Sequence, residues 1–470
     1  MFKRVLVANR GEIAVRIIRA LREMGIESVA VYSDADRGAL HTILADYAFS
    51  LGGNRAQDTY TNVDKIINIA KISSADAIHP GYGFLSERPN FAEAVENSGK
   101  TFIGPKSEII QLMGDKIEAR KFMSTLGVPL VKGSPAGIED YEEASKTAEE
   151  IGYPVLVKAA AGGGGMGMKL VNAHDELIPT IEAVRETAIS LYNDDSIFIE
   201  KYLKYPRHIE VQVLGDKHGN YLHLGERECS IQRRHMKIVE ETPSLAISQE
   251  VREEMTKAAL AIAEAVGYDS VGTVEFIYED GEFYFLEMNT RIQVEHTITE
   301  IVTSIDIVKE QISIAAGLPL SFEQNDVKFS GHAIECRIYA EDPLNSFIPS
   351  PGKITDYITP GGPGIRLDSG VKAGYTVSTH YDSMLSKIIT SGRDRSEAIT
   401  RMNRALEEFY IEGIKTNIPL LIAIMKDKDF ELSNISTKFL EENTALMDEC
   451  TSERKTVFLS IDKQELNYNE

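Results

Sequence analysis

Hydrophobic and polar positions alternate most regularly along two neighbouring segments in the second half of the chain. Gly272–Glu279 and Phe283–Asn289 both have the two-residue period of a half-buried strand, and the turn dipeptide Asp280-Gly281 lies between them. The pattern predicts an antiparallel hairpin. Strict alternation along the second strand would place four side chains on one face: Phe283, Phe285, Glu287 and Asn289.

The predicted hairpin carries one carboxylate in each strand. Glu275 can face Glu287 only if the loop is odd or a strand is bulged, because a two-residue loop would pair Glu275 with Leu286. We expect such a loop or bulge, since paired carboxylates and the amide of Asn289 would offer the oxygen ligands that suit Mg²⁺ or Mn²⁺. An edge hairpin with solvated charges is the alternative that these residues leave open.

The first eighty residues show a different pattern. Val5–Ala8 reads as a buried strand, a helix-spaced apolar series follows, and Ser28–Tyr32 reads as the next strand, which together predict the start of a parallel sheet. The turn between strand and helix lacks the three spaced glycines of a dinucleotide site, so the pattern favours a Rossmann-like sheet without NAD. A further strand, Ala75–His79, ends in a glycine-rich loop where Tyr82 either lines a cleft or packs structurally.

A run of glycines interrupts two short strands in the middle of the chain. Pro154–Lys158 leads into AAAGGGGMGM, and Lys169–Val171 follows it. Glycines let backbone N–H groups approach phosphate oxygens closely, although the P-loop pattern is missing. We favour a phosphate-covering lid over a flexible linker.

Other segments supply helices and polar strand faces. Residues 250–266 have the period of an amphipathic helix, and Thr297 and Glu300 form a capping-box pattern before a core-facing helix that continues to Ile312. Alternation would group His208 with Glu210 and Gln212, and Arg337 with its neighbours on strand Ala333–Tyr339. The basic run from Gln232 to Lys237 is either a solvated face or an anion site.

Composition narrows the classes of function. A net charge of −22 and a pI near 5.0 argue against nucleic-acid binding, and 470 residues suffice for two or three domains. Three scattered cysteines indicate a reducing, cytoplasmic location, and neither a signal peptide nor a membrane segment is apparent.

Six segments, in this order along the chain, resemble the biotin carboxylases, which are ATP-grasp enzymes. They are HPGYGF at 79–84, MGDK at 113–116, AGGGGMGM at 161–168, CSIQRRHMKIVEE at 229–241, EMNTRIQVEH at 287–296 and GHAIECRIYAEDP at 331–343. The resemblance runs from Lys3 to about Glu442 and implies an α/β and α+β fold. It implies a Rossmann-like domain at 1–113, an ATP-grasp domain at 114–330 with a lid at about 131–203, and a C-terminal domain at 331–445, while residues 446–470 stay unassigned.

The resemblance also implies an activity. It is the carboxylation of biotin with ATP and bicarbonate, through carboxyphosphate, as the first half-reaction of a biotin-dependent carboxylase. We expect the biotin to arrive on a biotin carboxyl carrier protein or biotinylated partner subunit, since the Ala-Met-Lys-Met tetrapeptide is missing here. A homodimer is a further expectation, as is a carboxyltransferase subunit. The acceptor, whether acetyl-CoA, another acyl-CoA, pyruvate or another 2-oxoacid, is not encoded in these residues, although the C-terminal segment looks slightly more like pyruvate-type subunits.

Two other functions are compatible with parts of the sequence. A carbamoyl-phosphate-synthetase-like ligase also phosphorylates bicarbonate, but those chains carry the grasp unit twice and no internal repeat occurs here. Loss of the metal-binding or anion-binding residues would have indicated a non-catalytic nucleotide-binding subunit, but this sequence has all of them.

The site residues follow from the resemblance. The implied catalytic residues are Lys237, Arg291, Glu295 (the general base) and Arg337. Bicarbonate and biotin would contact Tyr82, Lys237, Arg291, Gln293, Val294 and Arg337. The nucleotide would contact Lys116, Lys158, Gly163, Gly164, Gly165, Met168, Glu200, Lys201, Leu203, His208, Gln232, His235, Glu275 and Glu287. The divalent ions, Mg²⁺ or Mn²⁺, would be held by Glu275, Glu287 and Asn289. The chain departs from the family at Met166, where a basic residue is usual, at Met236, where glutamine is usual, and at Thr297, where proline is common.

Overall fold

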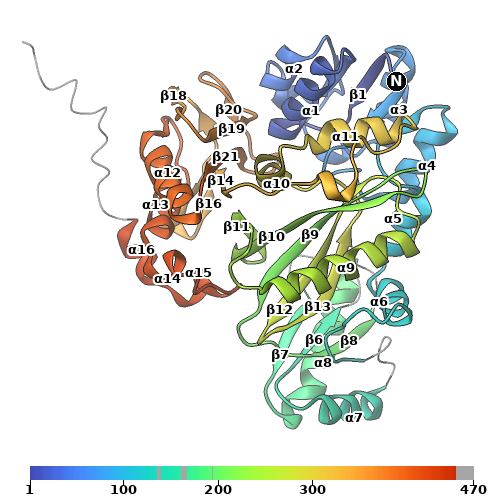
Figure 1. Ribbon diagram of the computed structural model, residues 1–470, viewed down its shortest axis with the longest axis vertical. Helices are drawn as coiled ribbons and strands as arrows, with labels where there is room; N and C mark the ends of the chain where they lie inside the picture. Colours follow the sequence, from blue (N-terminus) through green and yellow to red (C-terminus); the bar gives the residue numbers. More distant parts are fainter. Residues whose placement is uncertain (135–137, 139, 160–166, 193, 451–470) are drawn as a thin grey trace, which may run out of the picture.

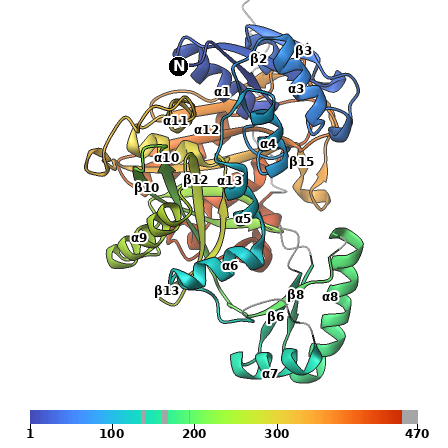
Figure 2. The same ribbon diagram turned by 90° about the vertical axis from the view of Figure 1, so that its right-hand side faces the viewer.

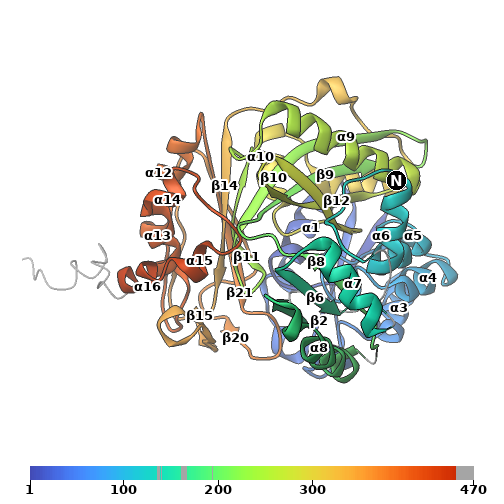
Figure 3. The same ribbon diagram turned by 90° about the horizontal axis from the view of Figure 1, so that it is seen from below.

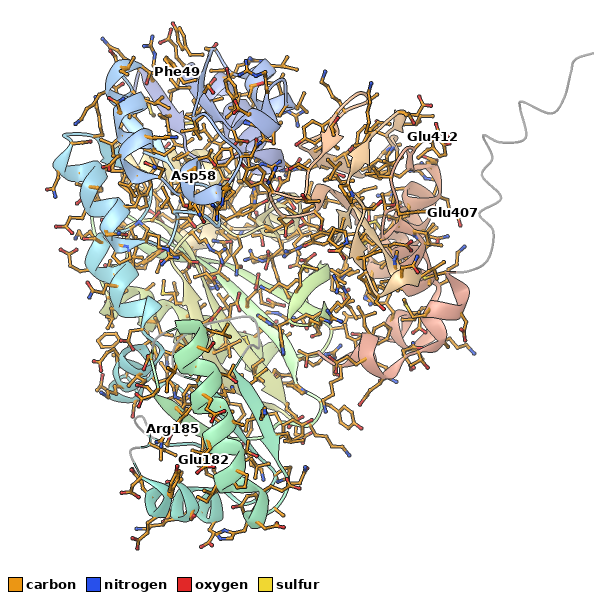
Figure 4. The ribbon with its side chains drawn as sticks, turned by 180° about the vertical axis from the view of Figure 1, so that it is seen from behind. Phe49, Asp58, Glu182, Arg185, Glu407 and Glu412 are labelled. Atoms are coloured by element: carbon orange, nitrogen blue, oxygen red, sulfur yellow. The ribbon has the colours of Figure 1, made fainter. Side chains whose placement is uncertain are left out.

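The computed structural model describes residues 1–134, 138, 140–159, 167–192 and 194–450. Three lobes are visible in Figure 1: the N-terminal sheet, a small projecting lobe, and a large sheet that continues into the C-terminal helices. Figure 4 marks the lobes from behind, with Phe49 and Asp58 on the first, Glu182 and Arg185 on the second, and Glu407 and Glu412 on the third. Among the described residues, no helix is both long and apolar enough to cross a membrane.

The N-terminal lobe contains the predicted parallel sheet. Its strand order is β3-β2-β1-β4-β5, and every pairing is parallel. The strands are β1 (Arg4–Val7), β2 (Glu27–Tyr32), β3 (Tyr47–Ser50), β4 (Ala77–His79) and β5 (Thr101–Phe102). The helices are α1 (Gly11–Glu23), α2 (Leu40–Leu44), α3 (Val63–Ile72), α4 (Pro89–Asn97) and α5 (Ser107–Gly114), and 3₁₀ turns span Asp34–Asp36 and Ala56–Asp58. Apolar side chains on both faces of the sheet are buried, as parallel sheets require.

The projecting lobe corresponds to the predicted lid. A three-stranded sheet, β7-β6-β8, packs against two helices around a small apolar core of its own. The elements are α6 (Lys116–Thr125), which leads into the lobe, and then α7 (Tyr141–Ile151), β6 (Val155–Ala159), β7 (Met168–Val171), α8 (Leu177–Tyr192) and β8 (Ile197–Lys201), with a 3₁₀ turn at His174–Glu176. Figure 2 shows this lobe standing away from the remainder of the molecule, attached through α6 and the segment after β8.

An eight-stranded antiparallel sheet joins the central and C-terminal parts of the chain. Its order is β13-β12-β9-β10-β11-β14-β21-β19. The strands are β9 (Arg207–Gly215), β10 (Tyr221–Arg233), β11 (Met236–Thr242), β12 (Val271–Glu279), β13 (Glu282–Asn289), β14 (His332–Tyr339), β19 (Ile365–Ser369) and β21 (Met384–Gly392). Helix α9 (Gln249–Ala265) packs its apolar face on this sheet, as its period predicts.

The C-terminal part adds helices and short strands around one apolar cluster. The helices are α12 (Arg395–Glu408), α13 (Ile418–Lys426), α14 (Lys428–Glu431), α15 (Phe439–Glu442) and α16 (Ala445–Glu449). The short strands are β15 (Glu341–Asp342), β16 (Ile348–Pro349), β17 (Gly352–Lys353), β18 (Tyr357–Ile358), β20 (Thr376–Val377) and β22 (Tyr410–Ile411), and 3₁₀ turns span Gln324–Asp326 and Pro343–Asn345. Figure 3 shows the helices gathered on one side of the sheet, opposite α3 to α6. Helix α16 packs on this cluster, so the segment predicted as an unassigned tail begins with ordered structure, while residues 451–470 lie outside the described part.

The hairpin β12–β13 forms as predicted, but the prediction that four side chains of its second strand share one face is wrong. Its turn has two residues, Asp280 and Gly281, both with positive φ, but Glu275 still pairs with Glu287 because Leu286 is bulged out of the register. The expected bulge is therefore present. Beyond it the alternation inverts, so Phe283 and Phe285 pack with Phe276 in the core and do not share the face of Glu287 and Asn289.

The predicted capping box is wrong. The helical segment splits into α10 (His296–Thr303) and α11 (Ile307–Ala315), because Ser304 adopts a left-handed conformation and Asp306 caps the second helix. Thr297 donates a hydrogen bond to Glu335 and caps nothing, and Glu300 binds Arg16 and Arg366. Local sequence could not show that these side chains meet charged groups from distant segments.

Candidate active site

A row of charged residues crosses four neighbouring strands of the large sheet. Strand pairing sets Arg227 opposite Glu210, Glu210 opposite Glu275, and Glu275 opposite Glu287. Opposite charges on facing positions attract, but three glutamates that follow one another across adjacent strands repel. The row therefore needs further cations beside Arg227.

Lys237, on β11, supplies one of them. Its Nζ lies 2.5 Å from Glu210 Oε2, 2.9 Å from Glu275 Oε1 and 2.6 Å from Glu295 Oε1. Burial would lower the pKa of Lys237, but the three carboxylates raise it well above its ordinary value. Lys237 is therefore charged, and one positive charge is shared among three negative ones.

Glu295, directly before α10, is also held by Arg337 of β14. The Arg337 Nη2 atom lies 2.9 Å from Glu295 Oε2, and its Nε donates to Glu240 Oε1 at 2.6 Å. Burial would raise the pKa of Glu295, but Lys237, Arg337 and Arg227 hold it well below its ordinary value. Burial raises the pKa of Glu240 to about 7 against the opposing charge of Arg337. Of the two carboxylates on Arg337, Glu295 is thus the one that stays ionised.

The predicted metal ligands lie side by side on the hairpin. Asn289 Nδ2 donates to Glu275 Oε1 at 2.9 Å, and His208 Nε2 lies 2.9 Å from Glu275 Oε2. Burial and the charge of Glu275 raise the pKa of Glu287, while Lys116 lowers it. The buried Glu275 and the half-buried Glu287 form a like-charged pair with an amide beside it. Such a pair fits a hard divalent cation, so these three residues are compatible with Mg²⁺ or Mn²⁺.

Among the residues that the structure describes, two other groups of side chains could be considered for a metal. They are His208, Glu210 and Glu275, and Glu210, Cys229 and Glu295. The ammonium of Lys237 contacts carboxylates of both groups, so a cation already lies among them. The Glu275–Glu287 pair is the better candidate for a divalent ion.

Arg291, Gln293 and Val294 follow the hairpin, as predicted. Arg291 donates from Nε to Glu87 Oε2 at 2.8 Å and from Nη2 to Asn289 Oδ1 at 2.5 Å. Gln293 Nε2 donates to Glu275 Oε1 at 2.5 Å. The Arg291 guanidinium and the Gln293 amide thereby reach the edge of the metal-ligand group.

Arg227 is a central residue that the sequence analysis missed. Its side chain is fully buried and donates to five acceptors, two of them at 2.8 Å, Gln212 Oε1 and Gln293 Oε1. The others are Glu210, Thr299 and Thr273. Because Gln293 accepts through its oxygen, its NH₂ group must point to Glu275. The one signal in the sequence was a charged residue two positions before Cys229, where the segment at 229–241 that resembles the family begins.

Several residues of the projecting lobe that were predicted to contact the nucleotide lie near Glu200. This buried carboxylate on β8 forms ion pairs with Lys158 of β6 and Arg120 of α6. Strand pairing sets Met168 opposite Lys158, and Lys116 lies at the start of α6. Arg120 was not predicted, because the sequence around it indicates only that it belongs to a helix and does not show which side chains it meets.

The remaining predicted nucleotide residues divide into three sets. Lys201 donates from its backbone N–H to Lys132 O at 2.7 Å and from Nζ to Gly152 O at 2.8 Å, and Leu203 is half-buried just beyond β8. Gln232 Nε2 lies 2.9 Å from His208 Nδ1, and His235 occupies the exposed turn between β10 and β11. Gly163, Gly164, Gly165 and Met166 lie outside the described residues.

Tyr82 joins the site from the N-terminal lobe. Its hydroxyl donates to Glu12 Oε1, and Lys387 lies 3.5 Å from the same oxygen. Lys387 also donates to the carbonyl of Val294. Glu12, Glu87 and Lys387 were not predicted, because their contacts arise between segments at least 70 residues apart in the sequence.

Three protein-family models match successive parts of the chain. Family models described as biotin carboxylase, N-terminal domain, and biotin carboxylase C-terminal domain match residues 1–110 and 335–442. The model for the ATP binding domain of the carbamoyl-phosphate synthase L chain matches residues 115–323.

Individual relatives cover nearly the full chain. A pyruvate carboxylase subunit of Methanothermobacter thermautotrophicus is 53% identical over 442 residues, which are 94% of this chain and 90% of that protein. Biotin carboxylase 1 of Bacillus subtilis is 53% identical over 443 residues, 94% of this chain and 98% of that protein. A solved structure of the Hydrogenobacter thermophilus 2-oxoglutarate carboxylase biotin carboxylase domain dimer, with MgADP, ADP and bicarbonate, has a TM-score of 0.91 and 49% identity, covering 95% and 99% of the two chains.

Proposed function

This chain belongs to the biotin carboxylase family, and from that premise we propose how its residues carry out the ATP- and bicarbonate-dependent carboxylation of biotin. It is an ATP-dependent ligase. The match to the carbamoyl-phosphate synthase model covers the ATP-binding part alone, while both flanking parts match biotin carboxylase domains. The carbamoyl-phosphate-synthetase-like alternative is therefore the weaker one.

One observation carries the proposal: Glu295 lies between two cations, Lys237 and Arg337, beside the paired glutamates of the hairpin. A non-catalytic nucleotide-binding subunit would have no need of a buried carboxylate held in this way. In this arrangement Glu295 could accept a proton from bicarbonate, and Arg337 could stabilise the oxyanion that forms on biotin.

The two substrates of the first step would meet at the hairpin. Glu275, Glu287 and Asn289 would hold Mg²⁺ or Mn²⁺, which when bound neutralises the charge of the phosphates of ATP. Arg291, Gln293 and the backbone of Val294 would bind bicarbonate, for which the forked guanidinium matches a planar oxyanion. Lys237 would attract the same anion once Glu210 and Glu275 are neutralised by other cations.

Proton transfer would fall to Glu295. Its carboxylate is ionised and can accept the bicarbonate proton as the γ-phosphoryl group moves to the bicarbonate oxygen, giving ADP and carboxyphosphate. Carboxyphosphate would then divide into CO₂ and phosphate. The released phosphate, or Glu295 after it has passed its proton to that phosphate, would remove the ureido proton of biotin, and the nitrogen would attack CO₂ while Arg337 stabilises the enolate-like oxygen.

The nucleotide would lie between the lid and the large sheet. Lys116 and Lys158 would contact its phosphates, and His208, Gln232 and His235 its ribose and phosphate side. Glu200, Lys201, Leu203 and Met168 would surround the adenine. The glycines Gly163 to Gly165 would close over the phosphates, and closure of the lobe at about 131–203 would keep water from carboxyphosphate.

Partners belong to the same proposal. The relatives named as subunits, and the dimer described for the 2-oxoglutarate carboxylase domain, support a homodimer that works with a biotinylated carrier and a carboxyltransferase. We divide the chain at 1–113, 114–330 and 331–445, although one sheet crosses the second boundary. The three cysteines are buried and unpaired, which suits the cytoplasm.

The test is ADP release by the purified chain, measured with and without bicarbonate and with and without free biotin. We expect release to depend on bicarbonate and to increase with biotin. An equal rate of ADP release with and without bicarbonate would contradict the proposed function.

A further inference from the structure

Lys387 is a buried lysine with no solvent-exposed surface, outside every residue set considered above for ATP, metal, bicarbonate or biotin. It lies on β21, where strand pairing sets it beside Arg337 of β14 on one side and Asp368 of β19 on the other. Lysine is almost never fully buried unless it is paired, because desolvating an ammonium is costly. The partners of Lys387 therefore indicate why it is there.

One partner is the carbonyl of Val294, which accepts a hydrogen bond from Lys387 Nζ. This carbonyl belongs to the peptide unit that joins Val294 to Glu295. Helix α10 begins at His296 with Glu295 as its N-cap, so the Val294 carbonyl precedes the hydrogen-bonded ladder of the helix. Because a peptide unit is planar, a donor that fixes its oxygen also fixes the backbone nitrogen of Glu295.

The other partner is Glu12, at the start of α1 in the N-terminal lobe. Lys387 Nζ lies 3.5 Å from Glu12 Oε1, and the hydroxyl of Tyr82 donates to the same oxygen. Glu12 is buried, and its second oxygen has no partner among the described residues. Lys387 is the cation that offsets this buried carboxylate.

We propose that Lys387 is a positioning residue that couples the two ends of the active site. Through the Val294 carbonyl it orients the backbone that carries Glu295, and through Glu12 it orients Tyr82. Arg337, which lies opposite Lys387 on the neighbouring strand, binds the side chain of Glu295. Lys387 therefore holds the backbone next to Glu295, and Arg337 holds its carboxylate. The inference rests on the proposed function, because it assigns these contacts to the bicarbonate and biotin ends of that reaction.

The experiment compares Lys387→Met with Lys387→Gln, two uncharged side chains of similar length of which only Gln can donate to the Val294 carbonyl. We expect Met to lower kcat for biotin carboxylation at least tenfold and to raise KM for bicarbonate and biotin, with KM for ATP within twofold. The kcat of Lys387→Gln should be at least threefold higher than that of Lys387→Met. Lys426→Met, which removes an exposed lysine paired with Glu407, is the control and should match the unmodified chain.

Equal losses in Met and Gln, or a KM for ATP that rises as much as that for biotin, would overturn the proposal in favour of a purely structural lysine. If Lys387→Met does not fold, Glu12→Gln tests the Tyr82 end. It should raise KM for biotin at least threefold and more than KM for ATP, and an equal rise in both would likewise overturn the proposal. Failure of the proposed function is distinct, because the unmodified chain itself would then lack bicarbonate-dependent ADP release.

Discussion

Glu275 and Glu287 lie directly opposite each other on adjacent antiparallel strands, although the loop between the strands has only two residues. The bulge at Leu286 makes this pairing possible. Placing the buried Glu275 opposite the half-buried Glu287 is unfavourable unless a cation joins them. This unfavourable arrangement supports the proposed metal site, at which binding would offset the repulsion.

Replacing one member of this pair should move stability and activity in opposite directions. We expect Glu287→Gln to raise the free energy of unfolding without metal by about 0.5–1 kcal/mol, because a like-charge repulsion is removed. The Mg²⁺ concentration for half-maximal activity should rise at least tenfold. Thermal unfolding with EDTA and a Mg²⁺ titration of ADP release measure the two effects. Glu282→Gln, which replaces the exposed glutamate of the Glu279–Glu282 pair in the same hairpin, is the matched control. A parallel response in both variants would argue against a metal site.

Glu295→Gln should separate binding from chemistry. The amide keeps the shape of the carboxylate but cannot accept a proton, and a general base commonly contributes about 10²–10⁴-fold to the rate. We expect turnover to fall within that range while ATP affinity changes less than threefold, as measured by steady-state kinetics and nucleotide titration. Glu407→Gln, on an exposed ion pair, should change neither quantity. Lost nucleotide affinity with normal turnover would show that Glu295 has another role.

Arg227→Lys should destabilise the protein even though the charge is kept. Arg227 donates to five acceptors, and the three donors of an ammonium cannot satisfy them all. Each buried acceptor left without a donor costs about 1–3 kcal/mol, so we expect a loss of about 2–4 kcal/mol in denaturant unfolding. Arg404→Lys, in an exposed pair with Glu408, should lose less than about 0.5 kcal/mol. Similar losses at both positions would contradict a central role for Arg227.

Acid should weaken the N-terminal lobe through His41. Burial lowers the pKa of His41 from 6.5 to about 4, against the charge of Asp36 and with that of Arg10. The unfolded chain therefore binds the proton first, so the stability contribution is complete above pH 6.5 and is lost as the pH falls toward 4, by about 3 kcal/mol. Thermal midpoints at pH 7.5, 5.5 and 4.5 should fall more steeply for the unmodified chain than for His41→Gln. Equal slopes would show that His41 is not responsible, and the exposed His380→Gln serves as the control.

The biotin should be found on another protein. The purified chain should give no streptavidin signal, and labelled bicarbonate should pass to an added biotinylated carrier domain only when this chain and ATP are present. Supplying carriers of acyl-CoA and 2-oxoacid carboxylases in parallel identifies the partner class. A streptavidin-positive band from this chain would overturn the prediction of a separate carrier.

The sequence by itself was enough to predict the main elements and to single out many of the residues proposed for the chemistry. Two-residue alternation and the Asp280-Gly281 turn sufficed for the hairpin, and the spacing of Ile13, Ile17 and Leu21 sufficed for α1, because these patterns depend only on neighbours along the chain. The resemblance of six segments supplied the residues of the active site.

Only the tertiary structure decided which charges meet. The left-handed Ser304 ends α10 where the apolar period continues without a break, and Arg227, Glu12 and Lys387 acquire their roles from hydrogen-bond and ion-pair partners on other strands and lobes. A buried charge is stable only where several distant segments bring its partners within hydrogen-bonding distance, and that condition is set by packing in three dimensions, which no local pattern of hydrophobic and polar residues contains.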